Sequence, residues 1–169
     1  MKNVHLLPTD KPSRIGYLTK KGKEVFNHLV LFDRMMPIIL DSENQHIYIT
    51  SDEEIKEGDW YLNVEEKNGI KNPFYGKLYK ANQSIGKVSL DYLVNNLKKI
   101  ILTTDTDLIE CGIQSIDDEF LEWFVKNLSC EWVEVLYDYF QVDQNNPVLR
   151  GSTSLVKQHK IIIPQEEPK

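Results

Sequence analysis

The segment from Lys98 to Cys130 places the clearest strand pattern of the chain directly before its clearest helix pattern. The apolar run at 98–103 predicts a buried strand. Beyond it, large apolar residues recur at helical spacing up to about Asn127 and form a wide stripe: Ile116, Phe120, Leu121, Trp123 and Phe124. A stripe of that width has to bury against a sheet. The chain is therefore constrained to a fold in which this helix packs on strands.

The acidic residues of this segment coincide with signals for the start of helices. Ser115 is predicted to cap the main helix, because three acids follow it where the helix dipole favours negative charge: Asp117, Asp118 and Glu119. Thr104 and Asp107 predict a second cap, with a single turn that stops at Gly112. Capping explains these acids without a metal ion, since no D-x-D-x-D-G pattern supplies further oxygen ligands. No metal site is predicted.

The rest of the chain is mostly strand-like. Ser51 and Glu54 match a capping box that predicts one helical turn, and Asn68-Gly69 is a hairpin signal. A short helix is predicted at Ser89–Leu97. Alternating and β-branched patterns predict strands at Arg14–Thr19, two short ones within 24–40 around Pro37, His46–Thr50, Trp60–Val64, Glu131–Tyr139 and Leu155–Ile163.

These patterns together predict an α+β fold. We expect a mostly antiparallel, curled sheet or a small β-barrel with one main amphipathic helix packed on it. The 169 residues fit a single domain over 1–163, followed by an acidic C-terminal tail at 164–169.

Charge is spread unevenly along the chain, whose formal net charge is −6. Residues 101–140 carry ten acids against Lys126, whereas residues 71–100 carry six lysines against Asp91. Only three arginines occur, which is a poor supply for bidentate contacts with phosphates or bases. Sequence-specific DNA binding is therefore disfavoured.

Hydropathy and cysteine usage point to the cytosol. No apolar run approaches the roughly 18 residues of a membrane span, and the apolar run near the N-terminus is too short for a signal peptide. Cys111 and Cys130 lie outside any C-x-x-C motif, which favours reduced, packed thiols over a disulfide or a metal site.

Motifs that would carry catalysis are missing from the sequence. There is no G-x-S-x-G, H-E-x-x-H, G-x-x-x-x-G-K-[ST] or G-x-G-x-x-G pattern, and the four histidines are solitary. No catalytic residue and no cofactor is predicted. Aromatic residues interleaved with lysines are the best candidates for binding a ligand, although a half-buried strand explains the same pattern: Trp60, Tyr75, Lys77, Tyr79 and Lys80.

Four blocks of the sequence resemble a protein family that occurs in phages and bacteria of the Bacteroidetes group. These blocks read HIYITSDEEIKEGDW, KKIILTTDTDLI, IDDEFLEWFVKNLSCEWVEV and KIIIPQEEPK, and they cover about half of the chain. Residues 14–45, 65–97 and 140–158 look like its variable part. The family has no established function or catalytic residue to carry over. The resemblance implies a small accessory protein of a phage or mobile element, acting in the cytosol of a bacterial host.

The leading hypothesis is a non-catalytic, phage-type binding protein. It would sequester a small ligand, such as a nucleotide-like signal, or dock on a host protein. One alternative is a small-barrel RNA-binding module, with a basic face around Lys71, Lys77, Lys80 and Lys87. Another is an enzyme that uses Asp105 and Asp107 together with a histidine that lies close in space.

Overall fold

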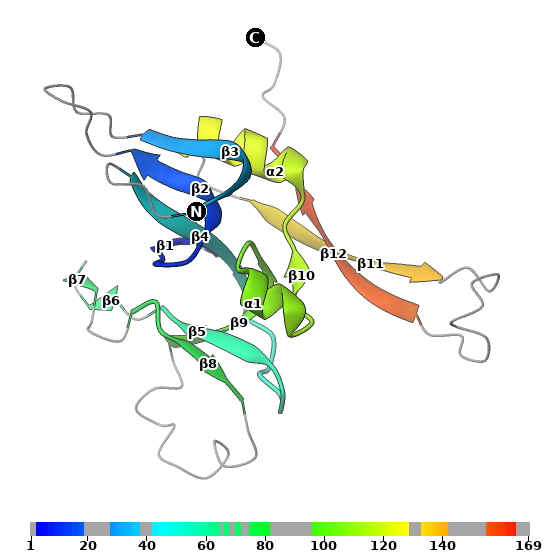
Figure 1. Cartoon of the computed structure of the whole chain (residues 1–169). Helices are drawn as coiled ribbons and strands as arrows, with labels where there is room; N and C mark the ends of the chain where they lie inside the picture. Colours follow the sequence, from blue (N-terminus) through cyan, green and yellow to red (C-terminus); the bar gives the residue numbers. More distant parts are fainter. Residues whose placement is uncertain are drawn as a thin grey trace, which may run out of the picture.

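A computed structural model describes residues 3–18, 28–37, 42–64, 66–67, 70–71, 75–81, 96–128, 133–141 and 155–164. Strands dominate these residues, and two short helices accompany them (Figure 1). The helices are α1 (Thr106–Glu110) and α2 (Asp118–Lys126). The strands are β1 (Val4–Pro8), β2 (Ser13–Leu18), β3 (His28–Met36), β4 (Ser42–Ser51), β5 (Trp60–Asn63), β6 (Glu66–Lys67), β7 (Ile70–Lys71), β8 (Leu78–Lys80), β9 (Leu97–Thr103), β10 (Gln114–Ser115), β11 (Glu134–Gln141) and β12 (Leu155–Ile162).

The main sheet is built around β4, which pairs antiparallel with β1, β2 and β9. Its order among the described strands is β3-β2-β4-β9-β5-β8, with β1 attached to β4 and β10 attached to β9. Among the described strand pairs, the short β10–β9 pairing is the one that is parallel. The predicted α+β class with a mostly antiparallel curled sheet is confirmed, and the sheet does not close into a barrel.

Two apolar clusters cover the two faces of β4. Ile47 and Ile49 belong to a large cluster that includes Phe120, Leu121 and Phe124 of α2. Tyr48, which points to the other face, belongs to a smaller cluster with Leu62, Ile100 and Leu108. Sheet packing of the main helix is thereby confirmed: Phe120 and Phe124 are buried, and Trp123 packs against the same cluster.

Both helices begin at an aspartate rather than at the residue predicted from the sequence. The Asp117 side chain caps α2 by accepting a hydrogen bond from the Phe120 amide at 2.7 Å. The prediction of Ser115 was wrong, because Ser115 pairs with Thr103 in the β10–β9 ladder. Asp105 caps α1 instead of Thr104, because the Thr104 hydroxyl accepts from the Ile47 amide of β4 at 2.9 Å. Gly112 has a φ of 98° beyond α1, as the sequence predicted for a stop.

No helical turn follows Ser51, so the predicted capping box is wrong. Ser51 remains in β4, paired with Lys99 of β9, and this pairing keeps the backbone extended. The chain then turns at Gly58, whose φ of 88° is the left-handed conformation expected there. This turn leads into β5.

Most of the other strand predictions hold where the structure describes the residues. β6 and β7 flank Asn68-Gly69 as an antiparallel pair. The prediction of two short strands within 24–40 is wrong for the described residues, because His28–Met36 forms one continuous strand, β3, that pairs with β2 and ends before Pro37. Residues 38–41 lie outside the described ranges. The helix predicted at Ser89–Leu97 also falls largely outside them, although Leu97 itself begins β9.

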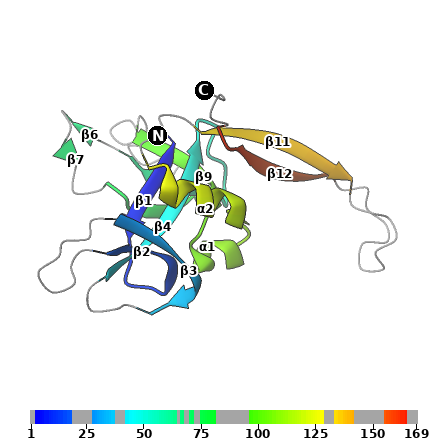
Figure 2. The same cartoon turned by 90° about the horizontal axis from the view of Figure 1, so that it is seen from above.

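β11 and β12 form an antiparallel hairpin, as predicted, with a continuous register from Glu134↔Ile162 to Gln141↔Leu155. Figures 1 and 2 show this hairpin extending away from the main sheet. Its base is attached by the Gln114 side-chain amide, which accepts from the His159 amide and donates to the His159 carbonyl, each at 2.7 Å.

Cys111 is a free thiol and is exposed, so the expectation of a packed thiol is wrong for this residue. Its position explains the exposure, because it forms the C-cap of the short helix α1 and precedes the turn at Gly112. Cys130 lies outside the described residues.

Candidate functional site

The site begins with an unusual row of polar side chains on β4. Asn44, His46, Tyr48 and Thr50 occupy alternate positions of the strand and therefore share one face of it. All four are buried. Because a buried polar group is costly without a partner, this face requires polar groups from other elements to cover it.

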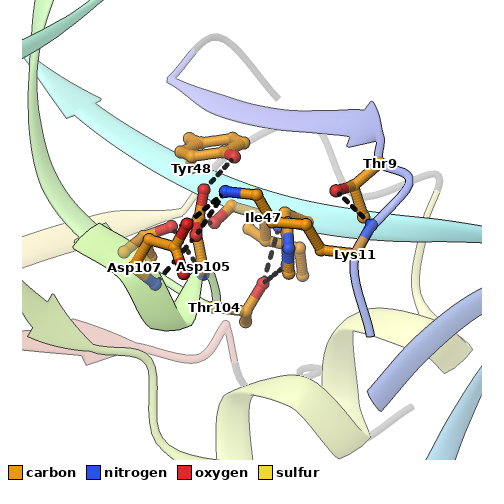
Figure 3. A network of polar contacts seen from close by, with 9 residues as sticks. Thr9, Lys11, Ile47, Tyr48, Thr104, Asp105 and Asp107 are labelled. Carbon is orange, nitrogen blue, oxygen red and sulfur yellow. Dashed lines mark hydrogen bonds and ion pairs between the residues drawn. The ribbon is translucent and has the colours of Figure 1, made fainter. Parts of the chain in front are cut away.

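Asp105 supplies the central partner for this row. Its carboxylate is almost fully buried, with the residue only 2% exposed. Oδ2 accepts a hydrogen bond from the Tyr48 hydroxyl at 2.9 Å, and Oδ1 accepts from the Asp107 amide at 3.1 Å (Figure 3). The Asp105 amide in turn donates to the Thr103 hydroxyl at 3.0 Å. The cap of α1 is thus also an acceptor for a tyrosine on β4.

Lys11 reaches the same carboxylates from the loop between β1 and β2. Its Nζ lies 2.5 Å from Asp107 Oδ2 and 4.0 Å from Asp105 Oδ1 (Figure 3). The loop is fixed to β4 because Asn44 Nδ2 donates to the Lys11 carbonyl at 2.9 Å and the Thr9 amide donates to the Asn44 carbonyl at 2.8 Å. We call Lys11, Tyr48, Asp105 and Asp107 the Asp105 network.

Burial and nearby charges shift the pKa values of three side chains in this region away from neutrality. Burial, reinforced by the Asp105 carboxylate, raises the pKa of Tyr48 far above its ordinary value. The hydrogen bond to Asp107 raises the pKa of Lys11. Burial lowers the pKa of His46 below its usual 6.5. At neutral pH the phenol, the ammonium and the uncharged imidazole are therefore the stable forms.

A pocket of about 660 Å³ lies next to the Asp105 network. Its volume is within the range of sites for small molecules, roughly 300–1,000 Å³. Three strands, a loop and a helix cap form it: the end of β1 with the loop at 9–11, β4, β8 with the turn before it, and the N-cap of α1. The lining residues are Leu7, Pro8, Thr9, Asp10, Lys11, Glu43, Asn44, Tyr48, Gly76, Leu78 and Asp105.

Two buried polar atoms of β4 lack a hydrogen-bond partner within the described part of the chain. Asn44 donates through Nδ2 to the carbonyls of Lys11 and Met36, at 2.9 and 3.1 Å, but its Oδ1 accepts from no group. His46 places Nδ1 3.5 Å from the Thr104 hydroxyl, and its Nε2 is unpartnered. An unsatisfied buried acceptor costs about 1–3 kcal/mol, which is a reason to look for a ligand beside it.

The residues predicted to bind a ligand lie on or beside β5 and β8 and divide between the two faces of these strands. Trp60 pairs with Lys80, whose Nζ is 5.8 Å from the centroid of the indole ring. Tyr79 faces the other way and stacks on Tyr61, with ring centroids 5.3 Å apart.

Tyr75 and Lys77 flank Gly76 in the turn before β8. None of the five predicted ligand residues lines the 660 Å³ pocket, although their neighbours Gly76 and Leu78 do.

The charges of Asp105 and Asp107 act on His46 and oppose the effect of burial on the pKa of its imidazole. Within the described ranges no group of three or more His, Cys, Asp or Glu residues is arranged to hold a metal ion. The sequence signal for this site was available in the alternation of Asn44, His46, Tyr48 and Thr50, but alternation alone does not reveal that both faces of β4 are covered.

The fold and the pocket define an α+β protein with a mostly antiparallel sheet and a cavity lined by both polar and apolar residues. Comparisons with protein families, curated proteins and solved structures found no match. Among the described helices, neither has the length and apolar character needed to cross a membrane.

Proposed function

We propose that this chain is a non-catalytic binding protein that holds a small polar ligand in the pocket between residues 8–11, β4 and β8. The observation that carries the proposal is a cavity of about 660 Å³ whose wall includes the buried network partners Tyr48 and Asp105. In the setting suggested by the sequence, a phage-type accessory protein in the bacterial cytosol, such a pocket would sequester a small signal. A nucleotide-like signal is the first ligand class to test.

Protonation favours binding over acid–base catalysis. A general acid or base works best with a pKa near the operating pH. Here the pKa values of Tyr48 and Lys11 are raised and that of His46 is lowered, each away from neutrality. Groups with fixed protons are suited to orienting a ligand by hydrogen bonds. An enzyme built on Asp105 and Asp107 remains the alternative, and it requires a turnover that disappears in the Asp105→Ala, Asp107→Ala double variant.

Docking on a host protein is a second candidate function, favoured by the exposed side chains of the β11–β12 hairpin. Leu136 and Tyr137 are 44% and 42% exposed, respectively. Aromatic residues such as Tyr are enriched in protein interfaces relative to the rest of the surface. RNA binding would instead use lysines near β8, and its affinity should fall steeply with salt.

The proposal is tested with the purified full chain and a panel of nucleosides, nucleotides, amines, amino acids and sugars. Binding is followed by NMR chemical shifts and isothermal titration calorimetry. We expect at least one class to bind the unmodified chain and to lose affinity in Leu78→Trp, because the larger side chain fills the pocket. Leu128→Trp is the matched control, since Leu128 is exposed at the end of α2. If no compound of the panel binds, or if both variants bind equally well, the proposal of a small-ligand pocket at this place is refuted.

A further inference from the structure

The charges around the pocket point to a ligand of one sign. Three carboxylates line it, from Asp10, Glu43 and Asp105, against the single ammonium of Lys11. That ammonium is already bound to a fourth carboxylate, Asp107, at 2.5 Å. A phosphate entering the pocket would meet an excess of negative charge and a lysine that already has its counter-ion.

Hydrogen-bonding capacity shows the same asymmetry. The Tyr48 hydroxyl donates to Asp105, and both protons of the Asn44 amide go to backbone carbonyls. The Lys11 ammonium donates to Asp107, and the Thr9 hydroxyl, which accepts from the Lys11 amide, is a further side-chain donor of the lining. Acceptors are more plentiful, because the carboxylates of Asp10 and Glu43 lie at the exposed rim and Asn44 Oδ1 is unpartnered within the described residues. The pocket therefore suits a ligand that donates hydrogen bonds.

The remaining wall is apolar. Leu7, Pro8 and Leu78 line the pocket, and the Gly76 backbone lies beside Leu7 so closely that a Cβ there would come within 3.1 Å of a Leu7 methyl group. A hydrocarbon chain or ring would bury against these residues while a charged group faces the carboxylates.

We propose that the ligand of this pocket is an organic amine, with a protonated ammonium group directed to the Asp10, Glu43 and Asn44 side and its apolar part against Leu7 and Leu78. This inference rests on the proposed binding function. It replaces the phosphate-bearing ligand with a cationic one, since opposite charges attract most strongly where the site is partly shielded from water.

The test uses three probes of equal length and opposite or absent charge: n-pentylamine, n-pentanol and pentanoate. NMR shift titrations of the full chain at low salt measure each affinity, and AMP serves as the phosphate probe. We expect pentylamine to bind about tenfold more tightly than pentanol, and pentanoate and AMP to bind more weakly than pentanol. High salt should reduce the preference for the amine.

A pair of matched variants separates local charge from net charge. Asp10→Asn/Glu43→Gln neutralises two rim carboxylates, whereas Glu119→Gln/Glu122→Gln removes the same charge from the exposed surface of α2. These four side chains are exposed, so both proteins should fold. We expect the first variant to lose the preference for pentylamine over pentanol and the second to keep it.

The outcomes distinguish the two proposals. Equal binding of pentylamine and pentanol, or tighter binding of pentanoate or AMP, overturns the amine while leaving a ligand pocket in place. An unchanged preference in Asp10→Asn/Glu43→Gln also overturns it. If these probes and the wider panel all fail to bind, the proposed binding function itself is wrong.

Discussion

The two faces of β4 differ in what covers them, and the difference separates stability from binding. One face presents Ile47 and Ile49 to α2 in a continuous apolar cluster. The other presents Asn44, His46 and Tyr48 to Asp105 and the loop that carries Lys11. Apolar burial contributes stability without direction, whereas a buried polar network needs every partner in place. We expect substitutions on the apolar face to affect mainly folding, and those on the polar face to affect folding and the pocket together.

The largest effect is expected for Phe120→Ala on the apolar face. Phe120 of α2 is fully buried in the apolar cluster that contains Ile47 and Ile49 of β4. Removing a buried phenylalanine ring typically costs about 3–5 kcal/mol, because transfer energy is lost and a cavity remains. Urea unfolding monitored by circular dichroism gives the free energy of unfolding. Glu122→Ala, at an exposed position of α2, should change it by less than about 0.5 kcal/mol. A loss below 1 kcal/mol in Phe120→Ala would contradict this packing.

A second comparison sets the two helix caps against each other. Asp105→Ala and Asp117→Ala each remove an N-cap carboxylate, which typically costs about 1 kcal/mol. Asp105→Ala additionally leaves the buried Tyr48 hydroxyl without its acceptor, at a further cost of about 1–3 kcal/mol. We expect total losses of about 3 and 1 kcal/mol, measured by urea unfolding. Equal losses would mean that the bond between Tyr48 and Asp105 contributes nothing to stability.

Two glycines with positive φ test how tightly the pocket wall is packed. Gly76 and Gly58 have φ values of 79° and 88°, so alanine at either position strains the backbone by roughly 1–2 kcal/mol. A Cβ at Gly58 would meet no atom within 4 Å, whereas one at Gly76 would press on Leu7. We expect Gly76→Ala to destabilise more than Gly58→Ala by about 1 kcal/mol. A smaller loss in Gly76→Ala, in the same unfolding assay, would show that Leu7 moves aside freely.

The sequence was sufficient for the apolar face and insufficient for the polar one. Local patterns predicted the elements of the apolar face and one hairpin. They are the helical spacing of Phe120 and Phe124, the alternation of Ile47 and Ile49, and the dipeptide Asn68-Gly69. The contact between Lys11 and Asp107 joins residues 96 positions apart, and no local pattern encodes such a distance. The acids of 105–107 were correctly interpreted as belonging to a helix start.

The role of Asp105 as the hydrogen-bond acceptor of Tyr48 could not be predicted from the sequence, because an N-cap aspartate normally stays near the surface. Here the residue is buried, since the loop at 8–11 folds over β4. The aromatic and lysine pattern at 75–80 falls on β8 and the turn before it, whose Leu78 and Gly76 line the 660 Å³ pocket, whereas Tyr79 stacks on Tyr61. Ligand binding by the five aromatic and lysine residues stays a prediction. Alternation in a short strand does not say which face a ligand can reach.

The smallest predicted effect is a pH dependence that arises from the polar face of β4. The free energy of unfolding of the protein should fall on both sides of neutrality. His46 has a folded pKa below the unfolded value of 6.5, so the unfolded chain binds more protons in acid and stability falls as the pH drops below 6.5. Tyr48 has a folded pKa above the unfolded value of 10.0, so the unfolded chain loses its proton first and stability falls as the pH rises above 10. Unfolding free energies measured across this range should show both slopes.

Single substitutions assign each slope to its residue. His46→Gln should flatten the acid side and leave the alkaline side unchanged, whereas Tyr48→Phe should do the reverse, because each removes one titrating group from the same buried row. Ile47 and Ile49 have no titratable group. Ile49→Val is therefore the control for the apolar face, and it should lower the free energy of unfolding by about 0.5–1.5 kcal/mol at every pH. If the free energies of unfolding of His46→Gln and Ile49→Val changed with pH in parallel, the loss of stability in acid would come from groups outside β4. The two faces of β4 would then not differ in their pH dependence.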